Sequence, residues 1–339
     1  MYNLASLLPE ELESLLKDMG QPAFRGRQLF IWLQRGVKRY EQMTNIPKSL
    51  REQLQTEYPL RPPKLLRKQT SESDGTHKFL WELADGHTIE SVVMQYRHGN
   101  TVCISTQIGC KMGCAFCASG IDGFSRQLEP AEMLGQVRFS GIESNLQISN
   151  VVLMGIGEPL DNFERVIRFL ELLRHPDGMH IGGRHITLST CGLPQGIDKL
   201  ACYQLQLTLS VSLHAPDNET RDLIMPINRR YPLDEVFAAC RQYAAKTGRR
   251  VSFEYTLIDG VNDSPRHAKL LAARLQETGG HVNLIPLNAA AGCNLRPSPP
   301  ACVRQFADIL QNRGIAVTVR RRLGEDITAA CGQLRRNKM

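Results

Sequence analysis

The sequence has little of what membrane, disordered and repeat proteins are built from. No segment approaches the roughly 18 consecutive apolar residues that a membrane-spanning helix needs, and there is no internal repeat or low-complexity tract. Of the 339 residues, 42% are hydrophobic and 22% are charged, as in a globular protein. The beginning, MYNLASLLPEELESLL, carries acids and no basic segment, so we expect no secretory signal and a cytoplasmic protein without membrane partners.

An excess of charge of one sign is present only at the two ends. Lys and Arg total 41 against 34 for Asp and Glu, a net charge of +7. Residues 1–70 and residues 313–339 each carry an excess of about five positive charges, whereas the middle is slightly acidic. Basic ends suit a polyanion such as RNA, although ordinary solvated charge explains them equally well. The candidate phosphate contacts are Arg25, Arg27, Lys38, Arg39, Arg320, Arg321, Arg322, Arg335 and Arg336.

The spacing of apolar residues changes twice along the chain. Residues 1–65 have helical periodicity, which predicts a small N-terminal helical accessory domain. Residues 66–95 alternate with period two and predict a linking β-ribbon. Strand-like and helix-like runs then alternate over residues 96–325, which predicts an α/β fold with a partial (β/α)6 barrel of the TIM type. Residues 326–339 form a last loop and a basic tail.

Ten cysteines are too few and too clustered for a disulfide-stapled scaffold, so metal or redox chemistry is favoured. Cys110, Cys114 and Cys117 follow the first barrel strand with the spacing C-x3-C-x2-C. Three thiolates can hold three irons of a [4Fe-4S] cluster and leave the fourth iron open to a small ligand. A zinc site with a fourth ligand from elsewhere and accidental clustering are the alternatives, but no second short-spaced ligand pair follows Cys117.

Polar residues end the later strands of the predicted barrel, where such barrels carry their sites. Each is weak evidence by itself, since a terminal serine is more often a cap and a histidine is more often a hydrogen-bonded core residue. Together they predict a site for a charged nucleoside. The candidates are Gly157, Glu158, Ser189, Ser212, Leu213, His214 and Asn288.

Two further cysteines stand apart from the triplet. Cys103 lies in the first barrel strand, and Cys331 lies on a small-residue loop where a thiolate could be exposed. We interpret Cys191, Cys202, Cys240 and Cys302 as small buried hydrophobes. Cys293 is left undecided.

Several long motifs resemble one family in order and content. They are VVMQYRHGNTVCISTQIGCKMGCAFCASG, MGIGEPLDN, ITLSTCGLP, SVSLHAPDNETRDLIMPINRRYP, TLIDGVNDS, NLIPLN and DITAACGQL. They run from about residue 80 to 334 and resemble the RlmN family of adenine-C2 RNA methyltransferases, which belongs to the radical S-adenosylmethionine (SAM) superfamily and is related to the Cfr enzymes. The helical beginning also resembles that family's accessory domain.

The resemblance implies a role for each matching residue. Cys110, Cys114 and Cys117 would bind one [4Fe-4S] cluster, and the seven strand-end residues from Gly157 to Asn288 would bind SAM. Cys331 would carry a methyl group as S-methylcysteine, and Cys103 would be the resolving thiol that forms a transient disulfide with it. Glu90 would accept the proton from C2 of adenine, although by itself it would be interpreted as a solvated strand carboxylate.

The resemblance also implies substrates and partners. The family methylates adenine 2503 of 23S rRNA and adenine 37 of some tRNAs, uses two SAM molecules per turnover and takes electrons from a flavodoxin-type reductant. A monomer is the default expectation. The alternatives are a Cfr-type enzyme that methylates C8 of adenine, a zinc-containing RNA-binding factor without catalysis, and a radical enzyme that acts on a small metabolite.

Overall fold

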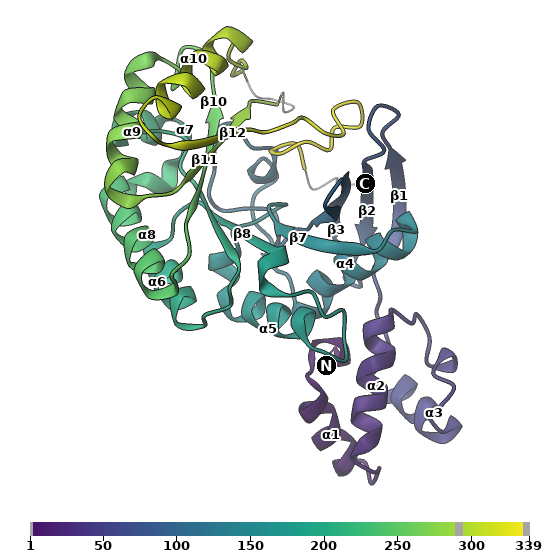
Figure 1. Cartoon of the computed structure of the whole chain (residues 1–339). Coiled ribbons are helices and arrows are strands. Elements are labelled where there is room, and N and C mark those ends of the chain that lie inside the picture. Colours follow the sequence, from purple (N-terminus) through teal and green to yellow (C-terminus); the bar gives the residue numbers. More distant parts are fainter. Residues whose placement is uncertain (1–2, 289–293, 335–339) are drawn as a thin grey trace.

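The computed structural model describes residues 3–288 and 294–334 (Figure 1). Ten strands form one curved sheet in the order β1-β2-β3-β4-β7-β8-β9-β10-β11-β12, and β5 pairs with β6 in a small second sheet. The strands are β1 (Lys64–Thr70), β2 (His77–Glu82), β3 (Thr88–Tyr96), β4 (Gly99–Cys103), β5 (Gln107–Ile108), β6 (Arg126–Gln127), β7 (Ile148–Leu153), β8 (Ile186–Thr190), β9 (Thr208–Ser212), β10 (Ser252–Leu257), β11 (His281–Pro286) and β12 (Ala316–Val319).

Helices alternate with these strands and cover the convex side of the sheet (Figure 1). Proline occupies the first turn of several of them, where its missing N–H costs no hydrogen bond. The helices are α1 (Pro9–Asp18), α2 (Phe24–Arg35), α3 (Lys48–Glu57), α4 (Pro130–Ser144), α5 (Phe163–Arg174), α6 (Pro194–Cys202), α7 (Asn218–Ile224), α8 (Leu233–Thr247), α9 (Pro265–Thr278) and α10 (Pro300–Gln311). None of the helices in the described ranges is long and apolar enough to span a membrane.

The predicted partial (β/α)6 barrel is confirmed. From β4 to β12 every neighbouring pair is parallel, and α4, α5, α6, α8, α9 and α10 make the six crossovers. The apolar residues of these strands form the core of the barrel, and the central residues Val151, Leu188, Leu209, Phe253 and Leu284 are fully buried. Helix α7 was not expected from the sequence. It begins at an Asp217 cap that accepts from the N–H of Thr220, a local signal that the sequence does contain.

The segment expected as a separate linking ribbon is part of the main sheet. Strands β1, β2 and β3 pair antiparallel, and β3 continues onto the first barrel strand, β4. On the outer face Phe79 and Trp81 stack with ring centroids 5.4 Å apart, and Trp81 donates to Ser91. The inner face continues that of the barrel. The expected domain boundaries at residues 65, 95 and 325 stay predictions.

Helices α1–α3 pack together below the barrel (Figure 1). Leu12, Leu16, Leu29, Leu33 and Leu50 are buried there, which matches the predicted helical periodicity. Ion pairs tie this part to the barrel helices, because Arg168 of α5 contacts Glu11 at 2.8 Å.

The barrel is open, because β1 and β12 are the two edges of the sheet and do not pair with each other. The chain after β12 crosses this opening toward the β1–β2 turn (Figure 1). Its Gly324 N–H donates to Asp74 at 2.8 Å, and its Asp326 carboxylate accepts from the N–H of Glu72 at 3.0 Å. The last described segment therefore lies over the inner face of the sheet.

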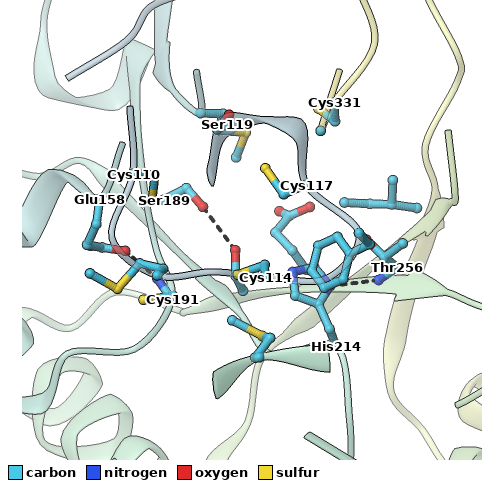
Figure 2. Close-up of a pocket in the computed structure, with 18 of the residues that line it drawn as sticks. Cys110, Cys114, Cys117, Ser119, Glu158, Ser189, Cys191, His214, Thr256 and Cys331 are labelled. Carbon is cyan, nitrogen blue, oxygen red and sulfur yellow. Dashed lines mark hydrogen bonds between the residues drawn. The ribbon is translucent and has the colours of Figure 1, made fainter. Parts of the chain in front are cut away.

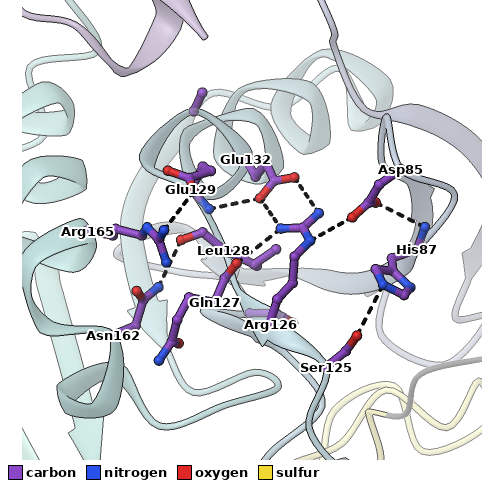
Figure 3. Close-up of polar contacts among 12 residues, drawn as sticks. Asp85, His87, Ser125, Arg126, Gln127, Leu128, Glu129, Glu132, Asn162 and Arg165 are labelled. Carbon is purple, nitrogen blue, oxygen red and sulfur yellow. Dashed lines mark hydrogen bonds and ion pairs between the residues drawn. The ribbon is translucent and has the colours of Figure 1, made fainter. Parts of the chain in front are cut away.

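A polar network holds the segment between β6 and α4 (Figure 3). The Arg126 guanidinium donates to Asp85 at 2.6 Å and to both carboxylate oxygens of Glu132 at 2.8 Å. The buried Asn162 amide donates to the carbonyl oxygens of Thr106 and Leu128, each at 2.9 Å. These bonds anchor the return end of the cysteine loop.

We expect Asn162→Ala to lower the free energy of unfolding by about 2 kcal/mol, because it removes two buried hydrogen bonds. Urea denaturation of the variant and the wild type measures the difference. Asn312→Ala, at an exposed position after α10, is the matched control and should change stability by less than about 0.5 kcal/mol. Equal losses in the two variants would contradict the anchoring role of Asn162.

Candidate active site

The cysteine loop leaves the first barrel strand and returns to α4. Its two ends pair as β5 and β6, with Ile108 opposite Arg126. Gly109 has φ +75°, and a Cβ atom there would lie 1.7 Å from the carbonyl oxygen of Gly123. Only glycine fits at this crossing of the two arms. The two arms of the loop are therefore in close contact at its base, and the three cysteines follow directly.

Cys110, Cys114 and Cys117 line one cavity at the carboxyl ends of the barrel strands (Figure 2). Burial raises the pKa of the Cys110 thiol to about 12, and burial also raises the pKa of Cys114. Neighbouring thiols of the triplet add to both shifts, since like charges oppose ionisation. Within the described residues, no three Cys, His, Asp or Glu side chains are grouped as ligands of a single metal ion.

The donors around this cavity fit a cluster with a bound nucleoside. Three thiols come from one short loop, and a metal would displace their protons. Asn288 Oδ1 is buried without a hydrogen-bond partner among the described residues, although its amide group donates to the carbonyl of Cys331 at 3.2 Å. An unpaired buried acceptor on a cavity wall is the kind of group that a polar ligand satisfies.

Glu158 lies deep in the cavity wall and is 3% exposed. Its Oε1 accepts from the N–H of Leu160 at 3.0 Å, and its Oε2 accepts from the N–H of Cys191 at 2.7 Å (Figure 2). Burial raises the pKa of Glu158, and these bonds oppose the rise. These bonds, together with hydrogen bonds to the side chains of Thr190 and Cys191, fix the carboxylate in the cavity wall.

The glycines before Glu158 are required by close packing of the chain. A Cβ atom at Gly155 would lie 2.6 Å from the carbonyl oxygen of Ile104, and one at Gly157 would lie 2.7 Å from the side chain of Gln107. Gly157 also has φ +112°. Both glycines are needed for packing against the segment after β4, and both also line the cavity.

Ser189, Ser212 and His214 line the same cavity from the ends of β8 and β9. The two serine hydroxyls are 3.5 Å apart (Figure 2). His214 Nδ1 accepts from the N–H of Thr256 at 2.9 Å, so the neutral ring carries its proton on Nε2. Leu213 is different, because its side chain is fully buried and does not line the cavity.

Cys331 lies at the junction of this cavity and a second one, and it lines both. Cys103 lines the second cavity on the inner face of β4. Burial raises the pKa of Cys103 to about 12, and the neighbouring Cys331 contributes to the shift. All described cysteines are free thiols, so Cys103 and Cys331 are not joined in this structure.

Main-chain hydrogen bonds hold the Cys331 loop against the cysteine loop. The carbonyl of Gly332 accepts from the N–H of Ala118 at 2.8 Å, and the carbonyl of Leu334 accepts from the Ser119 hydroxyl at 3.1 Å. Ser119 directly follows Ala118 and lies close to Cys117 in sequence. The two thiol-bearing segments, more than two hundred residues apart in the chain, are thereby brought together.

Glu90 does not line either of these cavities but lies on the inner face of β3. Its side chain is 3% exposed, and its Oε1 is 2.9 Å from the Lys78 ammonium. The interpretation of Glu90 as a solvated carboxylate is therefore wrong. Whether it accepts a proton from substrate stays a prediction.

Two charged residues of the cavity were not predicted from the sequence to lie there. Arg320, expected among the RNA contacts, lines both cavities beside Cys331, and its guanidinium approaches the Met154 sulfur at 3.7 Å. Glu254 was not singled out. It accepts from Ser210 at 2.5 Å and from Asn283 at 2.8 Å, and it lies on the strand VSFEYTLI as the one acid in an apolar run.

Arg321 and Arg322 are exposed but also line the second cavity with Arg320, whereas the basic candidates from Arg25 to Arg39 lie on the outside. Arg27 pairs with Asp177 at 2.7 Å, and Lys38 pairs with Glu143 at 3.3 Å. Arg25 donates to the carbonyl of Asn45 at 2.6 Å. Cys293, Arg335 and Arg336 lie outside the described residues.

Comparison with known protein families agrees with this geometry. The model of the radical SAM superfamily matches residues 104–271, and the model of the ribosomal RNA large subunit methyltransferase N-terminal domain matches residues 2–59. A radical SAM methyltransferase from Sphaerobacter thermophilus superposes with a TM-score of 0.95 at 45% identity, with 99% of each chain covered. The open barrel and its cysteine loop thus define a radical SAM enzyme, a class that implies SAM and a [4Fe-4S] cluster.

Full-length relatives identify the family. A Clostridium beijerinckii protein is 48% identical over 99% of this chain and 96% of its own length, and a Desulforamulus reducens protein is 47% identical over 98% and 96%. Both are named "probable dual-specificity RNA methyltransferase RlmN". The chain belongs to the RlmN family.

His214 should make the stability of the protein depend on pH. Burial and the nearby Arg221 lower the pKa of His214 from 6.5 to about 3. Between these values the unfolded chain binds a proton at this residue and the folded chain does not, so stability falls as pH is lowered from 6.5. We expect this residue to lower the free energy of unfolding of the wild type by up to about 1.4 kcal/mol per pH unit. This contribution should be absent in His214→Gln.

Urea denaturation at about pH 7, 6 and 5 measures this difference. The carboxylates titrate alike in both proteins, so only the difference between the two slopes reports on His214. Equal slopes would contradict a neutral, buried imidazole.

Proposed function

We propose that this protein transfers a methyl group to C2 of adenine 2503 in 23S rRNA and of adenine 37 in some tRNAs. The observation that carries the proposal is the position of Cys331. This thiol lines the cavity of the cysteine triplet and also the adjoining cavity that contains Cys103. A methyl carrier needs access to both the methyl donor and a resolving thiol, and Cys331 has both.

The chemistry at C2 explains why a thiol carrier is needed. C2 of adenine is an electron-poor carbon with no lone pair to attack a sulfonium methyl group. When bound, the cluster and SAM supply the radical chemistry that avoids this problem. Cys110, Cys114 and Cys117 would hold the cluster, and Gly157, Glu158, Ser189, Ser212, His214 and Asn288 would line the SAM site, with Leu213 supporting it from the core.

Three side chains of this chain would act on the methyl group and the base. The Cys331 thiolate would take a methyl group from one SAM molecule by displacement. A second SAM molecule would be consumed in activating the S-methyl group of Cys331. Glu90 would accept the proton from C2. Cys103 would then attack the Cys331 sulfur, release the methylated RNA and leave a disulfide for reduction.

Substrate access and partners follow from the same arrangement. A base edge can reach Cys331 only if the adenosine is unstacked or flipped into the mouth of the barrel. The exposed basic residues of the N-terminal helices would hold phosphates. We further propose a monomer that takes electrons from a flavodoxin-type reductant and acts in the cytoplasm.

Anaerobic reconstitution with iron, sulfide, dithionite, SAM and an adenosine-containing 23S rRNA fragment tests the proposal. We expect 2-methyladenosine by mass spectrometry of the digested RNA, together with 5′-deoxyadenosine. Cys331→Ala should retain the visible iron–sulfur absorbance and form no methylated RNA, because the carrier is lost. Cys202, interpreted from the sequence as buried, is in fact exposed on α6, so Cys202→Ala is the control and should remain active.

Three results would contradict the proposal. 8-Methyladenosine would assign the Cfr-type reaction instead. A colourless protein that binds zinc and forms no 5′-deoxyadenosine would indicate the RNA-binding factor. Methylated RNA from Cys331→Ala would exclude this cysteine as the carrier.

Cys103→Ala should trap RNA on the protein, because the Cys331–carbon bond to the base then has no resolving thiol. Denaturing gel electrophoresis of the reaction with labelled RNA should show a band of protein plus RNA that survives urea. The Cys103→Ala/Cys331→Ala double variant should lack this band. A single variant that turns over without any adduct would rule out Cys103 as the resolving thiol.

A further inference from the structure

A buried lysine joins two parts of the site that are far apart in the sequence. The Lys78 ammonium is 2.9 Å from Glu90 Oε1 and donates a second hydrogen bond, of 3.1 Å, to the carbonyl oxygen of Thr328. The side chains of Lys78 and Glu90 are only 10% and 3% exposed. One cation therefore contacts both the proposed proton acceptor and the loop that carries Cys331.

The register of the sheet fixes this arrangement. Lys78 on β2 is opposite Val92 on β3, and Val92 is opposite Cys103 on β4. Directly opposed residues share a face, so these three form one row on the inner face of the sheet. Glu90 lies two residues before Val92 on the same face. The ammonium, the carboxylate and the proposed resolving thiol are thus neighbours on one surface.

Strand pairing alone does not explain a buried ion pair at this place. A lysine is almost never fully buried without a charge partner, and burying an ion pair carries a desolvation penalty. The same meander contains a more exposed pair, Lys64 with Glu82 at 3.1 Å, which joins β1 to β2 at the far end of the same face. An inward-facing pair that also contacts the Cys331 loop indicates a role at the site.

The contact with Thr328 reaches a strained point of the Cys331 loop. Thr328 has φ +55°, a left-handed conformation that a β-branched residue rarely adopts. Such a conformation persists only where surrounding contacts hold it. The Lys78 bond to its carbonyl is one of those contacts, and the bond from Ala329 to the carbonyl of Gly324 at 2.9 Å is another.

We propose that Lys78 is a positioning residue that holds the Glu90 carboxylate and the Cys331 loop in one fixed arrangement. The acceptor of the C2 proton then faces the base while the sulfur delivers its carbon. This inference rests on the proposed function, because it takes the roles of Glu90 and Cys331 from there. Lys78 itself does not contact the reacting atoms.

Stepwise assays of Lys78→Met, Glu90→Gln and the double variant test the proposal. In Lys78→Met we expect normal methylation of Cys331 by SAM, accumulation of the covalent RNA adduct and a fall in methylated RNA of about 10²-fold, the usual range for loss of a proton acceptor. The double variant should be no slower than Glu90→Gln, since Lys78 acts on the rate through Glu90 and its bond to Thr328 acts on the exchange of the loop. Lys78→Arg should recover most of the rate.

Lys68→Met is the matched control. Lys68 lies on the neighbouring strand β1, is exposed, and also donates to a backbone carbonyl, that of Glu143 at 2.7 Å. Hydrogen exchange of the protein without cofactors gives a second readout. We expect faster amide exchange across residues 326–334 in Lys78→Met and wild-type exchange there in Lys68→Met.

The outcomes separate this inference from the proposed function. Two results would overturn the role of Lys78 if Glu90→Gln still impairs the reaction. One is a wild-type rate of methylation in Lys78→Met, and the other is a rate loss in the double variant that equals the product of the two single losses. A wild-type rate in Glu90→Gln would instead overturn the assigned proton acceptor. If Lys78→Met does not fold, Lys78→Gln replaces it in the test. Because Gln keeps a donor for the Thr328 carbonyl, we expect this variant to accumulate the covalent RNA adduct while amide exchange across residues 326–334 stays normal.

Discussion

The site depends on one constraint, which is that the barrel does not close. The sheet ends at β1 on one side and at β12 on the other, and these edges do not pair. The chain after β12 instead crosses the opening. It is held by the Asp74 side chain and the Glu72 N–H of the β1–β2 turn and by a main-chain bond to the cysteine loop. A closed barrel would leave no room for this segment, and Cys331 could not reach the cavity of the cysteine triplet.

Burial has two consequences in this interior. It keeps thiols protonated in the protein without cofactors, because the pKa values of Cys103, Cys110 and Cys114 are all raised. It also fixes two polar groups of the cavity wall, since His214 is neutral and Glu158 is held by two backbone N–H groups. Metal binding to the triplet would therefore be coupled to proton release. The remaining polar wall is already ordered before any ligand arrives.

The sequence predicted the parts of the fold that depend on periodicity. Alternating apolar runs located the barrel strands and six crossover helices, and the short spacing of three cysteines placed them on one loop. The sequence did not predict that β1–β3 would join the barrel sheet, since the alternation of apolar and polar residues does not determine which strands pair. Arg320 looked like one of three surface arginines, and only the turn after β12 directs it into the cavity. Nor did the sequence predict that the glycine at position 155 must accommodate the Ile104 carbonyl.

Glu90 and Lys78 show why such residues are hard to assign from sequence and easy to place in a structure. A charged residue in an alternating strand is typical of a solvent face. In the meander β2–β3, however, the face that carries Lys78, Glu90 and Val92 turns inward, because the large aromatic pair Phe79 and Trp81 already packs on the other side toward α4. The aromatic side chains pack into the core on the outer face, and the charged pair is left on the inner face of the sheet. The same alternation that builds the sheet thereby places an ammonium and a carboxylate on the face that also carries Cys103.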